Sequence, residues 1–313
     1  MKSIIRKKVE KIFFISLLKI KLASFYERLI ETSRYYLTPT KRRIVIGGYV
    51  NVYNNKIKHV NYGDDLTFYL LKELTEKKIF HYDKLFFQDS RNNILCIGSI
   101  IHNWSNPKTI IWGSGLMYND KPLMHKPEKV LAVRGPLTRK RLLEQGVECP
   151  EVYGDPALLL PIIYNPVVKK KFRYGIIPHY IDWNNKKVKM LTSNLENYTL
   201  INMALYDDWH DIINQICECE CILSSSLHGL IIADAYKVPN VWIEFSDEIL
   251  GNKFKYMDYF QSIKRKDLSP IVVESLESIN EISEAERTYE LLDINVESLL
   301  NSAPFELSNN FHR

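Results

Sequence analysis

Residues 224–233 read Ser-Ser-Ser-Leu-His-Gly-Leu-Ile-Ile-Ala and join two apolar segments of different length. The preceding Cys221-Ile222-Leu223 suits a buried strand, whereas the run after Gly229 is long enough for a helix. Where a strand ends and a helix begins, unpaired backbone N–H groups and the helix dipole attract anions. The stretch therefore predicts an α/β fold with an anion site. The alternative is a Ser cap beside a histidine, His228, that only fills a turn.

The composition is that of a globular protein with a substantial core. The chain has 313 residues, 46% apolar and 25% charged, enough for two domains. Its net charge is +5, from 42 basic and 37 acidic residues that are spread along the chain. This spread, without the Arg/Tyr pattern of an RNA-binding sheet, argues against nucleic acid as a partner. A mild positive charge suits an anionic substrate or membrane surface.

Residues 1–40 form a basic and apolar N-terminal segment. Arg6-Lys7-Lys8 precedes an apolar run at residues 12–18, which Lys19 and Lys21 end before it could span a bilayer. No small-residue cleavage site of a signal peptide follows. Two alternatives stay open: a helix on an anionic membrane surface, or a helix packed on the protein's own core.

From residue 41 onward, short apolar runs alternate with helical patterns, which predicts α/β units. Two βα domains that face each other across a cleft, residues 41–165 and 166–313, fit this order, with helices at the C-terminal end. The expected helices are residues 64–77 and 207–218, and an acidic helical region follows residue 267. The expected strands are residues 43–48, 93–99, 109–115, 130–135, 174–180, 188–191, 199–203, 222–223 and 240–245.

The chain shows no signature of a redox cofactor or a metal site. Gly47-Gly48 lacks the full Gly-x-Gly-x-x-Gly fingerprint of nicotinamide-binding proteins. Cys217, Cys219 and Cys221 are spaced too tightly for a zinc knuckle. We therefore predict reduced thiols, and neither a metal nor a cofactor.

Four motifs occur in a fixed order along the chain. They are Asn61-Tyr62-Gly63-Asp64-Asp65, Val133-Arg134-Gly135-Pro136-Leu137-Thr138, Gly154-Asp155-Pro156-Ala157-Leu158-Leu159-Leu160-Pro161 and Ser225-Ser226-Leu227-His228-Gly229. Together they resemble the polysaccharide pyruvyl transferase family, over residues 41–262.

The resemblance implies two Rossmann-like domains that face each other across a cleft, as in GT-B glycosyltransferases. It implies transfer of the enolpyruvyl group of phosphoenolpyruvate to a sugar of a surface-polysaccharide precursor, giving a pyruvate ketal and phosphate. The acceptor side is expected in residues 41–165 and the donor phosphate site in residues 166–313. If the acceptor is carried on a polyprenyl diphosphate, residues 1–37 would bring a cytoplasmic enzyme to the membrane.

The resemblance also assigns roles to the motif around His228. Ketal formation needs a proton at the enol carbon, and a histidine with a pKa near neutral can donate it. Ser225, Ser226 and the following backbone N–H groups, that of Gly229 included, would hold the phosphate.

Arg134 is the expected clamp on the carboxylate or phosphate of the donor. The alternative is an arginine paired with a nearby carboxylate such as Asp155. Many family members have Arg where this chain has Ser226, so one positive charge is missing. Lys255 is the expected substitute, unless it is a solvated loop lysine.

Five further residues are candidates for the cleft. Asp64 either caps the helix that it begins or, like Asp65, accepts hydrogen bonds from sugar hydroxyls. Asn61 stands at the same helix start. His179 and His102 each follow an expected strand, and they either reach the cleft or are hydrogen-bonded to neighbouring backbone.

Two other functions stay open. One is a nucleotide-sugar-dependent glycosyltransferase of the same architecture. The other is a non-catalytic carbohydrate-binding protein, which the departure at Ser226 would allow.

Overall fold

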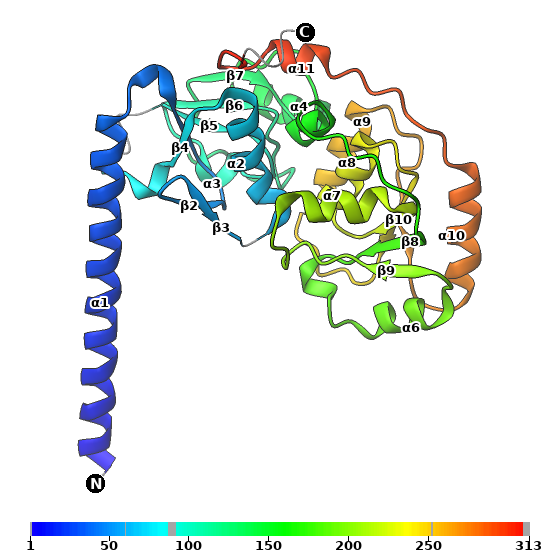
Figure 1. The fold of residues 1–313 in the computed structure, drawn as a ribbon, viewed down its shortest axis with the longest axis horizontal. Helices are drawn as coiled ribbons and strands as arrows, with labels where there is room; N and C mark the ends of the chain where they lie inside the picture. Colours follow the sequence, from blue (N-terminus) through cyan, green and yellow to red (C-terminus); the bar gives the residue numbers. More distant parts are fainter. Residues whose placement is uncertain (1, 60, 87–91, 252, 309–313) are drawn as a thin grey trace.

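The computed structural model describes residues 2–59, 61–86, 92–251 and 253–308, and for residues 2–18 it gives only the backbone. Two five-stranded sheets, parallel throughout, form its framework (Figure 1). The first has the order β4-β1-β5-β6-β7, and the second has the order β12-β11-β10-β8-β9. The strands of the first are β1 Arg43–Ile46, β4 Lys78–His81, β5 Asn93–Leu95, β6 Thr109–Trp112 and β7 Lys129–Ala132; those of the second are β8 Phe172–Ile177, β9 Tyr198–Leu200, β10 Cys219–Ser224, β11 Asn240–Glu244 and β12 Ile271–Val272.

The predicted α/β class is confirmed, because helices connect these parallel strands. A short antiparallel hairpin, β2 Asn51–Tyr53 with β3 Lys56–Lys58, is added beside the first sheet. The finer expectation of two Rossmann-like domains in a GT-B-like arrangement stays a prediction. The helices are α2 Tyr62–Thr75, α3 Ile101–Trp104, α4 Pro136–Glu144, α5 Leu160–Ile163, α6 Lys186–Asn194, α7 Trp209–Cys217, α8 Leu227–Ala235, α9 Phe254–Ser262, α10 Glu277–Thr288 and α11 Glu297–Asn301, with 3-10 turns at Thr40–Arg42, Tyr82–Lys84, Pro156–Leu159 and Tyr180–Asp182.

The predicted strand at residues 188–191 is wrong, because this segment lies in α6. The side chain of Asn185 caps the helix by accepting a hydrogen bond from the amide of Lys187. Val188 and Leu191 are both buried, and their separation of three residues places them on one helical face. The cap and this spacing outweigh the short apolar run from which the strand was predicted.

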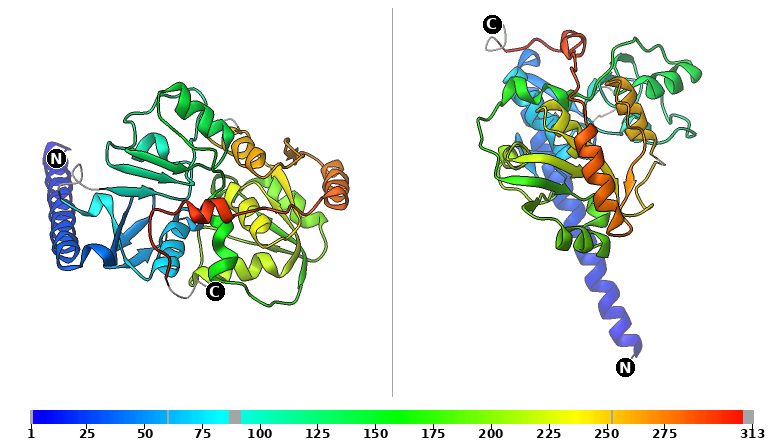
Figure 2. Two further views of the ribbon diagram at one scale, coloured as in Figure 1. Left: turned by 90° about the horizontal axis from the view of Figure 1, so that it is seen from above. Right: turned by 90° about the vertical axis from the view of Figure 1, so that its right-hand side faces the viewer.

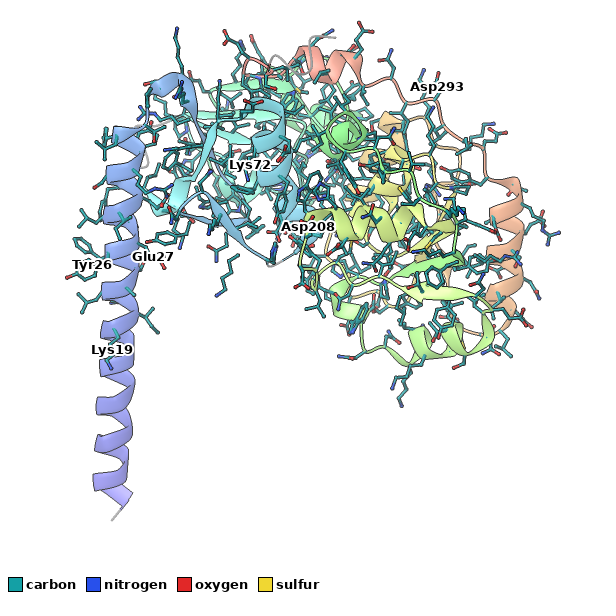
Figure 3. The ribbon with its side chains drawn as sticks, viewed as in Figure 1. Lys19, Tyr26, Glu27, Lys72, Asp208 and Asp293 are labelled. Carbon is teal, nitrogen blue, oxygen red and sulfur yellow. The ribbon has the colours of Figure 1, made fainter. Side chains whose placement is uncertain are left out.

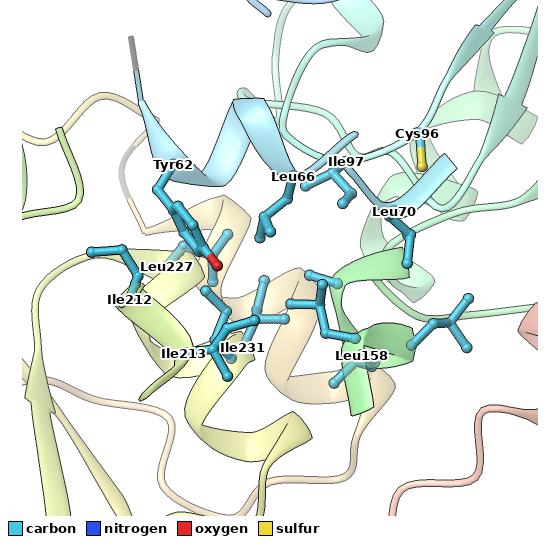
Figure 4. Close-up of a cluster of buried hydrophobic side chains, with 14 of the residues drawn as sticks. Tyr62, Leu66, Leu70, Cys96, Ile97, Leu158, Ile212, Ile213, Leu227 and Ile231 are labelled. Atoms are coloured by element: carbon cyan, nitrogen blue, oxygen red, sulfur yellow. The ribbon is translucent and has the colours of Figure 1, made fainter. Parts of the chain in front are cut away.

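The two sheets share a continuous apolar core. Helix α2 follows the first sheet's β1 and the hairpin, and it packs against α7 and α8 of the second half. Figure 4 shows this cluster, in which Leu66 of α2 lies on the side of Ile213 and Ile231 and Leu70 lies nearer Leu158. The Tyr62 hydroxyl donates a hydrogen bond to the carbonyl of Trp209 across the same contact. Side chains of these helices thus fill the space between the two sheets. Their contacts fix the position of the carboxyl edge of one sheet relative to that of the other.

The C-terminal region returns to the first half of the chain. Helix α10 lies along the second sheet, and the chain then crosses to α11 beside the first sheet (Figure 1). The indole Nε1 of Trp112 donates a 3.0 Å hydrogen bond to the carbonyl of Leu299. The expected helical region after residue 267 is present. Its last helix, α11, packs on the first sheet, although residues 166–313 were assigned to the second domain.

Residues Lys2–Leu37 form one long helix, α1. Its C-terminal part packs beside β4 and the turn that follows it, whereas its N-terminal part extends beyond the body of the protein, as Figure 1 and the right-hand view of Figure 2 show. The alternative of a helix packed on the core over its whole length is therefore wrong for the N-terminal part of the backbone. Within the part of the chain that the structure describes, we find no helix with the length and apolarity needed to cross a membrane.

Candidate functional site

A cavity of about 550 Å³ lies where the carboxyl ends of both sheets meet, and we call it the central cavity. Ligands in open parallel sheets bind at this edge. Six of the nine site residues predicted from the sequence line it, whereas the other three lie behind its wall. The lining six are Asn61, Asp64, His179, Ser226, His228 and Lys255. Their roles in binding or catalysis stay predictions.

His228 lies in the first turn of α8, and its imidazole is packed against the backbone of Gly63 in α2. A Cβ atom on Gly63 would stand 1.9 Å from Nδ1 of the ring, so only glycine leaves room for it. The Nε2 atom is shielded from solvent and has no hydrogen-bond partner among the described residues. Burial, with smaller contributions from the positive charges of Lys255 and Arg134, lowers the pKa of His228 to about 3. The ring is thus neutral at physiological pH unless an anion joins it.

Lys255 brings a positive charge to the central cavity from the start of α9. It is 8% exposed, which excludes the alternative of a solvated loop lysine. Burial and then the charge of Arg134 lower the pKa of Lys255 to about 8, against an opposing effect of Asp64. The ammonium stays mostly charged at neutral pH, in a place where solvent screens it little.

Asp64 faces the cavity from the first turn of α2, and it does not cap this helix. The cap is Asn61, whose side-chain oxygen accepts from the Gly63 amide at 3.3 Å, while its amide nitrogen donates to Asp64 at 3.3 Å. Burial first, and then the neighbouring Asp65, raise the pKa of Asp64 to about 7, although Lys255 and the Asn61 hydrogen bond act in the other direction. Asp64 can therefore exchange a proton near neutral pH. Asp65 points elsewhere, because it accepts a 2.6 Å hydrogen bond from Tyr206.

His179 and His102 both line the cavity, as their positions after strands suggested. The Nδ1 atom of His179 accepts from the amide of Ile181, and burial followed by the charge of Lys255 lowers its pKa to about 4. The Nε2 atom of His102 bonds the carbonyl of Lys121 at 3.1 Å, and burial lowers its pKa too. Both rings are neutral near pH 7 and can serve as hydrogen-bonding groups.

Ser226 occupies the N-cap position of α8 without forming a side-chain cap hydrogen bond. Its own amide donates to the hydroxyl of Ser224 at 3.0 Å. The amide groups of the first turn of α8 therefore have no side-chain cap, and Leu227, which begins that turn, lines the cavity with Ser226. This is the arrangement that favours an anion.

Ser225 and Gly229 lie behind the cavity wall and are not among the lining residues, and their predicted role in holding phosphate stays a prediction. The buried hydroxyl of Ser225 accepts from the amide of His179 at 2.8 Å, so this residue positions the His179 segment. Gly229 is needed for packing, because a Cβ there would stand 2.4 Å from the hydroxyl of Ser224. The close approach of α8 to β10 leaves neither residue in the lining.

Arg134 also does not line the cavity. It forms an internal ion pair, as the alternative expectation for this residue had it. Its guanidinium is fully buried and forms a salt bridge with Asp258 at 3.0 Å, instead of the expected Asp155. It also donates to the hydroxyl of Ser99, which does line the cavity. Asp258 further accepts from the amide of Thr138 at 2.8 Å and thereby ties α9 to the start of α4.

Sequence reasoning missed the aromatic residues of the central cavity. Tyr49 and Tyr118 line it from the first half, and Tyr180 and Trp183 from the second. Tyr49 accepts a 2.6 Å hydrogen bond from Asn103, another lining residue. Each follows a strand by a few residues, and that position could have identified them. Aromatic faces beside amide groups suit the apolar faces and hydroxyls of a sugar ring.

All five cysteines are buried and free. Burial raises the pKa of Cys149 and Cys219, each to about 12, so these thiols are poor nucleophiles. Across the described residues, no group of three or more His, Cys, Asp and Glu side chains is placed to hold a metal ion.

Comparisons with known proteins identify the family of the chain. The family model for polysaccharide pyruvyl transferase matches residues 49–247, which include all four sequence motifs. The chain is 28% identical over 215 residues to the succinoglycan biosynthesis protein ExoV of Rhizobium meliloti (strain 1021), covering 66% of this chain and 62% of that protein. It is also 28% identical over 214 residues to the uncharacterized protein L143 of Acanthamoeba polyphaga mimivirus, covering 65% and 71% of the two chains. The chain belongs to the polysaccharide pyruvyl transferase family.

Proposed function

We propose that the protein transfers the pyruvyl group of phosphoenolpyruvate to a sugar of a surface-polysaccharide precursor, forming a ketal and releasing phosphate. Family membership and the likeness to a succinoglycan biosynthesis protein support pyruvyl transfer in polysaccharide biosynthesis. The observation behind the finer proposal is that Lys255, His228 and Asp64 line one cavity with aromatic side chains. A cation for an anionic donor, proton-exchanging groups and a sugar-binding wall thus occur together.

The donor would bind at the second half of the cavity. Lys255 and the uncapped amides of α8 would hold its phosphate, and the Lys255 ammonium would replace the arginine charge that Ser226 lacks. A phosphate dianion beside His228 favours its protonated form, so the ring would take up a proton as the donor binds. This makes His228 ready to protonate the enol carbon, although it is neutral in the free protein.

The reaction then proceeds in balanced steps. Protonation at C3 of the enolpyruvyl group creates an oxocarbenium ion at C2, and one sugar hydroxyl attacks C2. The C2–O bond to phosphate then breaks, and phosphate leaves with the electron pair. A second hydroxyl of the same sugar attacks C2 to close the ketal ring and would return a proton to His228, which gave its own to C3. Asp64 would accept a proton from an attacking hydroxyl, because its raised pKa lies near neutral pH.

The acceptor would approach along the aromatic wall, where Tyr49 and Asn103 come from the first half. We further propose an acceptor carried on a polyprenyl diphosphate, at the cytoplasmic face of a membrane. The donor is a substrate, and this chemistry requires no additional cofactor.

The test is incubation with phosphoenolpyruvate and lipid-linked sugar acceptors, followed by phosphate release and the ketal-methyl signal in proton NMR. Lys255→Met should raise the KM for phosphoenolpyruvate at least about tenfold. Lys253→Met is the matched control, since Lys253 pairs with Glu244 at 2.8 Å and is not part of the lining. Transfer from a nucleotide sugar, saccharide binding without turnover, or equal effects of both substitutions would count against the proposal.

A further inference from the structure

Between residues 19 and 37, where the structure describes its side chains, helix α1 contacts the body of the protein through one face. Glu27 forms a 2.8 Å ion pair with Lys84, and Glu31 accepts a 2.9 Å hydrogen bond from the amide of Asn54. The hydroxyl of Thr32 accepts a 2.9 Å hydrogen bond from the amide of Phe86. These contacts fix the direction in which α1 leaves the body.

The opposite side of α1 is apolar and exposed, and we call it the outer face. At 100° per residue, its members fall within an arc of about 100°. Figure 3 shows Tyr26 pointing away from the body while Glu27 points toward it. Leu22 is 48% exposed and Leu29 is 46% exposed, and nothing in the described part of the chain covers them. The outer face consists of Leu22, Tyr26, Leu29, Ile30 and Leu37.

The N-terminal part of α1 contains the whole excess of basic over acidic residues in the chain. Residues 1–26 have seven basic residues and one acidic residue, whereas residues 27–313 have 35 basic and 36 acidic residues. The basic residues are Lys2, Arg6, Lys7, Lys8, Lys11, Lys19 and Lys21.

We propose that α1 binds an anionic membrane surface through its outer face and its basic N-terminal segment. An apolar helical face next to clustered lysines matches the acyl boundary and the anionic headgroups of such a surface. A second copy of α1 would provide the apolar area but would bring two strongly basic segments together, so charge disfavours this occupant. The body contacts at Glu27, Glu31 and Thr32 leave the outer face accessible to a flat surface.

Sedimentation of the full chain with large unilamellar vesicles tests the proposal. Vesicles with about 30% phosphatidylglycerol in phosphatidylcholine should bind it at least about tenfold more tightly than pure phosphatidylcholine. Raising the salt from about 0.05 to 0.5 M should weaken the binding. Leu22→Glu/Leu29→Glu should reduce binding at least about tenfold, because charges then replace the apolar outer face.

Val167→Glu/Leu205→Glu is the matched control, because it makes the same changes at exposed apolar residues in the second half of the chain. It should keep vesicle binding within about twofold of the wild type. Equal losses in both double variants would overturn the proposal. So would a salt-resistant dimer in light scattering that Leu22→Glu/Leu29→Glu dissociates, without vesicle binding by the wild type. Vesicle binding requires no turnover, so its failure would leave the proposed reaction untouched.

Discussion

Substituting Gly63 with alanine tests whether the two halves of the chain meet at the imidazole of His228. The new methyl group would stand 1.9 Å from Nδ1, 2.5 Å from Cγ and 2.7 Å from Cε1 of the ring. Ordinary contact requires 3.4 Å, so the ring must retreat by about 1.5 Å or the helices must separate. Either response moves His228 relative to Asp64 and Lys255 in the central cavity.

The stability change has two opposing parts. Alanine in place of glycine favours a helix by at most about 1 kcal/mol, and less in a first turn such as this one. Overpacking typically costs about 1–3 kcal/mol. We therefore expect Gly63→Ala to lower the free energy of unfolding by about 1–2 kcal/mol. A reacting group displaced by this distance loses about 100-fold in rate, so phosphate release should fall by that order.

A double-mutant cycle separates the clash from any other effect of the alanine. In a His228→Ala background the ring is gone, so Gly63→Ala should become neutral or slightly stabilising. Urea unfolding of the four proteins at pH 7, with unchanged m-values, would measure a coupling of about 1–3 kcal/mol. Equal costs of Gly63→Ala in both backgrounds would refute the packing of His228 on α2.

Three other predictions concern the charged groups. Asp258→Asn should lower the free energy of unfolding in urea by about 3–5 kcal/mol, because Arg134 then lacks its buried carboxylate; a loss below about 1 kcal/mol would contradict this. The folded protein retains the Asp64 proton to about pH 7, whereas an unfolded chain releases it near 3.8, so wild-type stability should fall as pH rises through this window. Asp64→Asn should thus stabilise the protein increasingly from pH 4 to 7, and a constant difference would argue otherwise. Calorimetric titration should show phosphoenolpyruvate binding weaken above about pH 8 as Lys255 loses its proton, and Lys255→Met should remove this dependence.

The α/β class could be predicted because its signals are local. The junction after Leu223 has a short apolar run, a polar turn and a helical run within a dozen residues, and the structure places β10 and α8 there. Such patterns depend on neighbours along the chain, which a sequence displays directly. The segment at residues 188–191 failed because four residues do not distinguish a buried strand from one helical turn.

The partners of the site residues could not be predicted, since they depend on contacts between distant segments. Arg134 follows a strand end, as a ligand-binding residue would, yet its guanidinium pairs with Asp258 in α9. Arg134 lies in one of the four sequence motifs, but nothing local indicates that its acceptor, Asp258, stands 124 positions away. Burial could not be read from the sequence either: the guanidinium is fully buried and already bonds a carboxylate, and a role of Arg134 in catalysis stays a prediction.

Contacts between distant segments also explain how Lys255 and Gly63 contribute to the same cavity. Asp258 and Lys255 lie three residues apart, near one face of α9, so the Arg134–Asp258 pair fixes the helix that presents Lys255 to the cavity. Gly63 brings α2 against His228, and α2 also presents Asp64. Lys255, His228 and Asp64 are thus positioned by buried contacts between the halves. Weakening those contacts should therefore reduce activity before it unfolds either sheet.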